Sequence, residues 1–127
     1  MSQDKKILVV EDNDFVRMQI VRYLEEHGYG ILEATDGIKA QELLTPQISL
    51  IILDIRMMPM DGFEFTKAIR GRYRTLPIIM VTGDQNPDLL NEASKWNVSA
   101  VLMKPVQKDR LVKMVERALL QAEKADR

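Results

Sequence analysis

Charged and hydroxyl-bearing side chains stand at the ends of four apolar runs in this sequence. They are Glu11, Asp12, Asp54, Thr82 and Lys104. Each run has the length and composition of a buried β-strand. If the strands are parallel, their carboxyl ends meet at one edge of the sheet, which is where open α/β sheets bind ligands. We therefore expect three carboxylates, one hydroxyl and one ammonium group to converge in a single crevice.

Three converging carboxylates suggest a particular chemistry. Carboxylates held close together repel one another, and the pKa of one of them is forced upward. A hard divalent cation removes this conflict, and Mg²⁺ is usually bound by one or two carboxylates together with waters and phosphate oxygens. A carboxylate beside bound Mg²⁺ can attack a phosphoryl group and form an acyl phosphate. The lysine and the threonine would then stabilise negative charge on the transferred group.

Taken singly, each of these residues also has an ordinary structural explanation. An aspartate after a strand is commonly a helix cap or a turn residue, which suits Asp12 and suits Asp61 even better. Thr82 precedes a glycine and could form a turn, and Lys104 could simply be solvated. Their occurrence together at four strand ends favours the site.

The elements that must position these residues alternate along the chain. Strands are expected over 6–10, 30–34, 49–54, 76–83 and 99–105, the second being the weakest. Helical periodicity follows each strand. The first helical pattern ends at the glycine-containing stretch 26–30, and the others cover 36–46, 62–72, 86–97 and 108–127. Strands that are apolar on both faces imply a parallel sheet covered by helices on both sides. The pattern predicts a doubly wound α/β fold of five βα units.

Two of these helices carry an apolar stripe that predicts the buried face. In the first helix the stripe is Phe15, Met18, Val21 and Leu24. In the last helix it is Leu111, Val115, Ala118 and Leu119. Apolar residues spaced by three and four positions are typical of a helix packed on a core. Pro87 is placed for the first turn of the fourth helix.

The composition excludes several classes of function. The 127 residues fit one domain over 1–127, and 46% are hydrophobic, as in soluble globular proteins. A net charge of −1 gives no electrostatic reason to bind nucleic acid or a membrane surface. Cysteine is absent, which rules out disulfides and thiol chemistry. No apolar run approaches the roughly 20 residues needed to span a bilayer, and we expect a cytoplasmic location.

Four motifs carry a resemblance to a known family. They are "VVEDND" at 9–14, "LDIRM" followed by "MDG" between 53 and 62, "MVTG" at 80–83 and "LMKP" at 102–105. With this order and spacing, the chain closely resembles the receiver domain of bacterial two-component response regulators from Lys6 to about Ala122. The resemblance implies a five-stranded parallel sheet of the flavodoxin-like receiver fold with strand order 2-1-3-4-5.

The resemblance also implies a role for each site residue. Asp54 would accept a phosphoryl group from a phosphohistidine on a sensor histidine kinase or a histidine phosphotransfer protein. The ligands of Mg²⁺ would be the carboxylates of Glu11, Asp12 and Asp54 and the backbone carbonyl of Arg56. Lys104 and the Thr82 hydroxyl would contact the phosphoryl group. The domain would act as a signalling switch that catalyses only its own phosphorylation and dephosphorylation, toward a downstream target that the sequence does not identify.

Further positions concern the lifetime of the phosphorylated state and its transmission. The resemblance places Arg56 and Asp84 beside the path of the attacking water, and their opposite charges could pair there. Val101 stands at a switch position that usually holds an aromatic residue. Because valine has a stiff, short side chain, we expect transmission to depend on the loop after Thr82 and on repacking of the fourth helix.

Other departures from the family pattern lie near the site. Val106 stands where phenylalanine is common. Met58 stands where the family usually has proline, and Pro59 comes one position later, so the resemblance does not predict the path of this loop. The methionines are expected mostly to fill the core, although Met57, Met58 and Met60 together could form an exposed apolar patch near the site. The peptide between Lys104 and Pro105 is expected to be cis.

Three other functions share parts of this pattern. A haloacid-dehalogenase-type phosphatase also uses an aspartyl phosphate but needs an acid two residues after its nucleophile, where this chain has Arg56. A flavin binder would not suit the acidic loop "EDNDF" at 11–15, where a phosphate should dock. A receiver-like interaction module without phosphorylation is disfavoured because all five site residues are retained. The domain could stand alone or be one piece of a longer protein.

Overall fold

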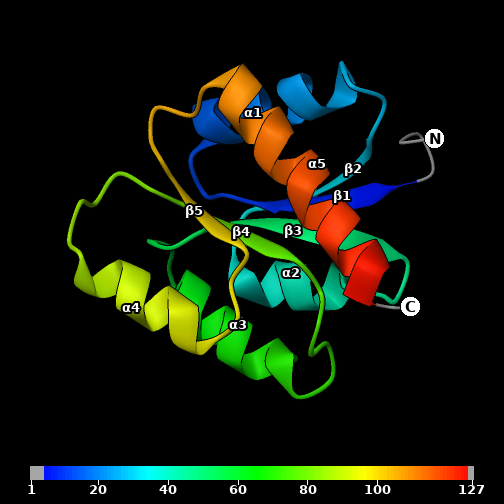
Figure 1. The fold of residues 1–127 in the computed structure, drawn as a ribbon. Coiled ribbons are helices and arrows are strands. Elements are labelled where there is room, and N and C mark those ends of the chain that lie inside the picture. The colour runs from blue at the N-terminus through cyan, green and yellow to red at the C-terminus, as the bar shows by residue number, and fades with distance from the viewer. Residues whose placement is uncertain (1–4, 126–127) are drawn as a thin grey trace.

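The apolar runs of the sequence pair into one parallel five-stranded sheet in the computed structural model, which describes residues 5–125. The ends of the expected domain, 1–4 and 126–127, lie outside the described residues. The strands are β1 Lys6–Val10, β2 Gly30–Ala34, β3 Ile48–Asp54, β4 Ile78–Thr82 and β5 Ala100–Met103. The helices are α1 Asp14–Glu25, α2 Gly37–Leu43, α3 Gly62–Arg70, α4 Asp88–Lys95 and α5 Lys108–Ala125 (Figure 1).

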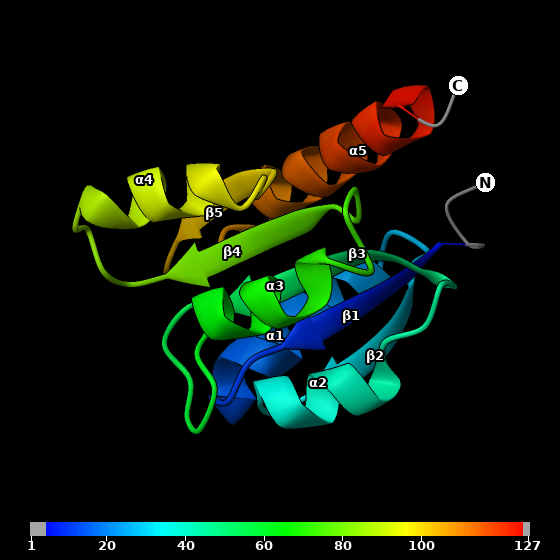
Figure 2. The ribbon, with the colours of Figure 1, turned by 90° about the horizontal axis from the view of Figure 1, so that it is seen from below.

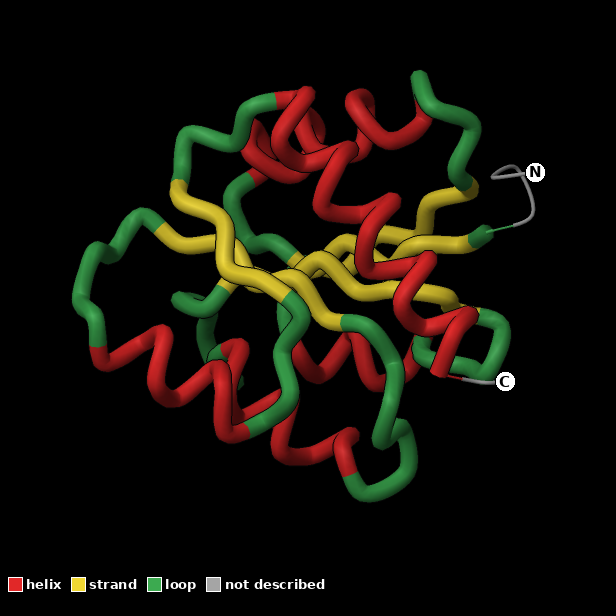
Figure 3. Tube along the Cα trace, viewed as in Figure 1, coloured by secondary structure: helices red, strands yellow, loops and turns green. Residues whose placement is uncertain are grey.

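The strand order is β2-β1-β3-β4-β5, which confirms the predicted topology. The central strand β3 is buried along nearly its whole length, which explains its continuous apolar run. Strand β2 lies at an edge and exposes its middle residues, which explains its weaker signal. All strand pairs are parallel, so the loops that follow β1, β3, β4 and β5 lie at the same end of the sheet (Figure 3).

Helices cover both faces of the sheet. Helices α1 and α5 pack on one face, and α2, α3 and α4 pack on the other (Figure 1). In Figure 2, seen from the second side, α2 and α3 lie in front of the sheet. Phe65 of α3 is fully buried in the second layer, which lies between the sheet and helices α2, α3 and α4. All four residues of the stripe predicted for α5 are buried in the first layer, so that helix was predicted correctly.

The buried face predicted for α1 was wrong in part. Phe15 is 85% exposed and Met18 is 59% exposed. The helix instead packs through Val16, Ile20 and Leu24, which follow one another at intervals of four. A strict spacing of three drifts around a helix of 3.6 residues per turn and leaves the core face.

The helix starts show why the chain turns where it does. The side chain of Asn13 accepts a hydrogen bond from the Val16 amide at the start of α1, and Asp36 caps α2 in the same way. Asp61 and Glu64 form a reciprocal capping box at the start of α3. Pro87 lies at the N-cap of α4, one position before its predicted place, and Oδ1 of the preceding Asn86 accepts a hydrogen bond from the Asp88 amide at 3.0 Å.

A helix that spans a membrane must be both long and apolar. Among residues 5–125, none is both long enough and apolar enough to cross a bilayer.

Candidate functional site

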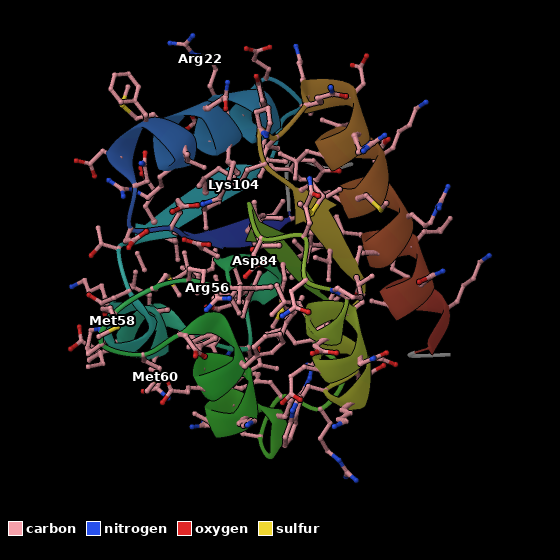
Figure 4. The ribbon with its side chains drawn as sticks, turned by 90° about the vertical axis from the view of Figure 1, so that its left-hand side faces the viewer. Arg22, Arg56, Met58, Met60, Asp84 and Lys104 are labelled. Atoms are coloured by element: carbon pink, nitrogen blue, oxygen red, sulfur yellow. The ribbon has the colours of Figure 1, made fainter. Side chains whose placement is uncertain are left out.

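The ends of four strands bring the predicted site residues to one place. Glu11, Asp54 and Thr82 are buried there, Lys104 is partly buried and Asp12 is exposed. Backbone hydrogen bonds continue the sheet just past the ends of these strands. For example, the Lys104 amide donates to the Thr82 carbonyl at 2.8 Å. Figure 4 looks onto this end of the molecule, with Lys104 near the middle of the view. The predicted convergence is therefore present in the fold.

Carboxylate oxygens of Glu11, Asp12 and Asp54 lie within 4.8 Å of one another. The ammonium group of Lys104 lies 3.0 Å from Oε1 of Glu11 and 3.5 Å from Oδ1 of Asp54. One cation thus faces two buried acids, with a third acid at the rim. The described side chains alone leave the cluster with an excess of negative charge.

This crowding changes the protonation of the buried acids. Burial is the main reason that the pKa of Glu11 rises to about 7, and the neighbouring Asp54 adds to the rise. Burial also raises the pKa of Asp54, although Lys104 and the Arg56 amide act in the opposite direction. Burial lowers the pKa of Lys104, but the two carboxylates outweigh that effect and the net shift is upward. Removal from water therefore makes the ionised cluster costly unless a further cation compensates it.

The donors available to the buried acids are few. Oε1 of Glu11 is buried, and its partner among the described residues is the Lys104 ammonium at 3.0 Å. The other oxygen, Oε2, accepts a hydrogen bond from the Asn13 amide at 3.1 Å. The same ammonium also faces Asp54, and one lysine cannot balance the charge of three carboxylates. The all-oxygen donor set fits Mg²⁺.

The loop after β3 holds Asp54 in place. The Arg56 amide donates to Oδ1 of Asp54 at 3.2 Å, and the Gly62 amide donates to the Ile55 carbonyl at 2.9 Å. A Cβ atom on residue 62 would lie 2.7 Å from the Asp54 carbonyl oxygen, so the close approach of α3 to the strand end requires glycine. The capping role of Asp61 agrees with its structural interpretation.

The methionines of this loop do not together form an exposed patch. Met57 is buried in the core, Met60 is partly buried, and only Met58 is strongly exposed, at 81%. Met60 packs against Gly37 at the start of α2, where a Cβ would meet its sulfur. The peptides before Pro59 and Pro105 are both cis, and the second of these was predicted. Although the proline stands one position later than in the family pattern, Asp61 still caps α3 and Gly62 still begins it.

Arg56 and Asp84 lie across the mouth of the site from one another (Figure 4). The Arg56 guanidinium donates a hydrogen bond to the Asp84 carboxylate, forming the predicted ion pair. The Asp84 amide in turn donates to Oγ1 of Thr82 at 3.0 Å. Because that oxygen accepts a bond, the hydroxyl hydrogen of Thr82 is left for an acceptor in the crevice.

Val101 is partly buried on the α2–α3–α4 side of the sheet. It follows that residue 101 contributes a small apolar contact to that layer rather than a ring. Val106, which also departs from the family pattern, is buried between the sheet and helices α1 and α5.

Two arginines with structural roles were missed in the sequence. Arg70 is buried and donates to the carbonyls of Tyr73, Leu76, Trp96 and Asn97. Arg17 donates to the backbone carbonyl of Glu11 at 2.7 Å. Only the second had a sequence signal, since Asp14 stands three positions before it on the same helix.

Most of the chain matches one known family. The profile of the response regulator receiver domain covers residues 7–116, which include every strand end described above. The chain belongs to this family. The receiver domain is the phosphorelay signalling domain of two-component systems, which agrees with the resemblance noted in the motifs.

Relatives of this receiver domain occur in proteins of different organisation. The CAI-1 autoinducer sensor kinase/phosphatase CqsS of Vibrio cholerae is 34% identical over 88% of this chain and 17% of its own length. The transcriptional regulatory protein PdtaR of Mycobacterium tuberculosis is 32% identical over 91% of this chain and 57% of its own length. The chain thus spans less than two thirds of these relatives.

A solved structure of similar size shows the same fold. The chemotaxis protein CheY4 of Vibrio cholerae superposes with a TM-score of 0.82 at 31% identity, covering 90% of this chain and 98% of that protein. A receiver domain of this length is therefore found both as a small protein and as a segment of a large one.

Proposed function

We propose that this receiver domain accepts a phosphoryl group on Asp54 in a Mg²⁺-dependent reaction and thereby switches its surface toward a partner. The supporting observation is the buried carboxylate of Asp54 at the end of β3, with the Lys104 ammonium 3.5 Å away and two further acids beside it. The domain comprises residues 1–127, and its location is cytoplasmic.

The donor is a phosphohistidine on a sensor histidine kinase or a histidine phosphotransfer protein. An oxygen of Asp54 forms a bond to phosphorus while the phosphorus–nitrogen bond of the phosphohistidine breaks. The electron pair of that bond stays on the imidazole. Lys104 neutralises charge that moves onto the phosphoryl oxygens, and the Thr82 hydroxyl donates to one of them.

Four oxygen donors would hold the metal. They are the carboxylates of Glu11, Asp12 and Asp54 and the backbone carbonyl of Arg56. Bound Mg²⁺ would supply positive charge that offsets the repulsion between the carboxylates and the incoming phosphoryl group. The rigid strand end keeps Asp54 aimed into the crevice while the Arg56 amide orients one of its oxygens.

The domain is not an enzyme acting on a separate substrate. Its chemistry is limited to gaining and losing the phosphoryl group on its own aspartate. It does not bind nucleic acid or membranes directly, and its downstream target is a protein contacted through the face that phosphorylation changes.

The acceptor is tested by incubation with acetyl phosphate and Mg²⁺, followed by mapping of the adduct by mass spectrometry. We expect one phosphoryl group on Asp54, none on Asp54→Ala, and none in excess chelator. Asp61→Asn is the matched control, because it alters a nearby acid while keeping the helix cap. Labelling of Asp54→Ala, or labelling that survives chelation, would contradict the proposal. Steady turnover of a phosphate ester would favour the phosphatase instead.

A further inference from the structure

Arg17 of α1 ties three segments together behind the acidic pair. Its Nη1 donates to the Glu11 backbone carbonyl at 2.7 Å, its Nη2 to Oδ1 of Asp14 at 2.6 Å, and its Nε to Oε1 of Glu33 at 3.1 Å. The side chain is only 13% exposed. We propose that Arg17 is a positioning residue for the metal site, holding Glu11 and Asp12 in the arrangement that Mg²⁺ requires. This inference rests on the proposed function.

The contacted carbonyl lies at the joint between the two acids. The Glu11 carbonyl and the Asp12 amide share one planar peptide group, so a bond that fixes the oxygen also fixes the plane from which Asp12 departs. Glu11 is further held by its own amide, which donates to the Ala34 carbonyl of β2 at 3.1 Å. Arg17 therefore sets the direction of the second acid relative to the first.

The guanidinium is itself held in one orientation. Glu33 comes from β2 and Asp14 from the first turn of α1, and each accepts from a different nitrogen of the planar group. A lysine has a single ammonium group and lacks the flat, branched geometry needed to reach all three acceptors in the same way. The acceptors thus specify arginine rather than any cation.

Charge and position predict opposite effects of removing Arg17. Its positive charge repels Mg²⁺, so a purely electrostatic role predicts tighter binding when the charge is removed. A positioning role predicts weaker binding, because groups behind metal ligands typically change metal affinity by roughly 10- to 100-fold. Mg²⁺ demands near-ideal octahedral geometry whereas Ca²⁺ accepts flexible coordination, so lost positioning should affect Mg²⁺ more than Ca²⁺.

The test is calorimetric titration of the full chain with Mg²⁺ and with Ca²⁺, without any phosphodonor. The variants are Arg17→Gln and Arg17→Lys. The matched control is Arg22→Gln, which removes the same charge from an exposed position on α1 that points away from the strand ends (Figure 4). We expect roughly tenfold weaker Mg²⁺ binding in both Arg17 variants and a smaller change for Ca²⁺. Arg22→Gln should bind as the wild type does.

The outcomes separate this inference from the proposed function. A wild-type protein that binds no Mg²⁺ would remove the proposed function, and the inference with it. A wild type that binds, together with Arg17 variants that bind Mg²⁺ equally or more tightly, would overturn the inference alone. Thermal unfolding in chelator establishes whether each variant is folded, and Arg17→Lys, which keeps the charge, decides the question if Arg17→Gln does not fold.

Discussion

The Arg56 guanidinium and the Asp84 carboxylate form an ion pair between the loops after β3 and β4, and the backbone amide of the same arginine donates to the proposed acceptor Asp54. Both side chains are partly open to solvent, so salt and water weaken the pair. Its expected consequence is therefore kinetic. We expect a pair in this position to restrict the approach of water to an acyl phosphate on Asp54.

Breaking that pair should shorten the lifetime of the phosphorylated state. We expect Arg56→Ala and Asp84→Ala each to speed dephosphorylation roughly two- to fivefold, the range suited to an exposed pair. The double variant should be no faster than the faster single variant, because either change removes the same contact. The rates are measured by loss of the phosphoryl adduct after removal of the donor. Strict additivity would show that the two residues act independently.

Switching should depend on Thr82 rather than on Val101. We expect formation of the fluoroberyllate complex with Mg²⁺ to change the fluorescence of Trp96, the only tryptophan, which follows α4. Val101→Ala should leave most of that change, because it trims a small apolar contact. Thr82→Ala should remove most of it, because it deletes the hydroxyl that links the crevice to the following loop. The reverse pattern would assign the switch to position 101.

Asp61 should contribute to stability and not to phosphorylation. Asp61→Ala removes the carboxylate that accepts from the Glu64 amide at the start of α3 and should lower the free energy of unfolding by about 1 kcal/mol. Asp61→Asn keeps a capping oxygen and should cost less. Urea unfolding gives the free energies, and labelling by acetyl phosphate should be unchanged in both variants. A loss of labelling in the asparagine variant would point to a direct role at the site.

Substitutions of two phenylalanines should have very different effects on stability, because one side chain is buried and the other is exposed. Phe65→Ala should destabilise the protein by about 3–5 kcal/mol, because it empties a fully buried position. Phe15→Ala should stay within about 0.5 kcal/mol, because that ring is largely exposed. Both variants are compared by urea unfolding. Equal destabilisation would mean that Phe15 packs more tightly than its exposure indicates.

The sequence predicted the sheet well because buried parallel strands leave a strong local signal. The runs ending at Asp54 and Thr82 contain almost only apolar residues, so their polar ends were easy to place. The face of α1 was predicted less well, since Phe15 and Met18 are apolar without being buried. Hydrophobicity identifies which residues favour the core, but the angle at which a helix docks decides which of them reach it.

Hydrogen bonds accepted by backbone carbonyls could not be predicted from the sequence. The acceptors of Arg70 are carbonyl groups, which every residue carries, so no residue type marks them in advance. The burial of Met57 and the exposure of Met58 could not be predicted either. Burial along an irregular loop depends on the path of its backbone. That path depends on where α3 begins on the end of β3.

Two of the four hydrogen bonds of Arg70 have a mechanical consequence for α4. They fasten the C-terminal end of that helix, at Trp96 and Asn97, to α3, and Lys67 adds an ammonium group 5.6 Å from the centre of the Trp96 ring. At the opposite end, after the Thr82 loop, Oδ1 of Asn86 accepts a hydrogen bond from the Asp88 amide at 3.0 Å, and the Asn86 amide donates to Oδ1 of Asp84 at 2.9 Å. Helix α4 is thus held by Arg70 at its C-terminal end and connected to Thr82 through Asp84 and Asn86 at its N-terminal end. We expect a displacement of Thr82 to move the N-terminal end most and to tilt the Trp96 ring slightly relative to Lys67, which its fluorescence would report.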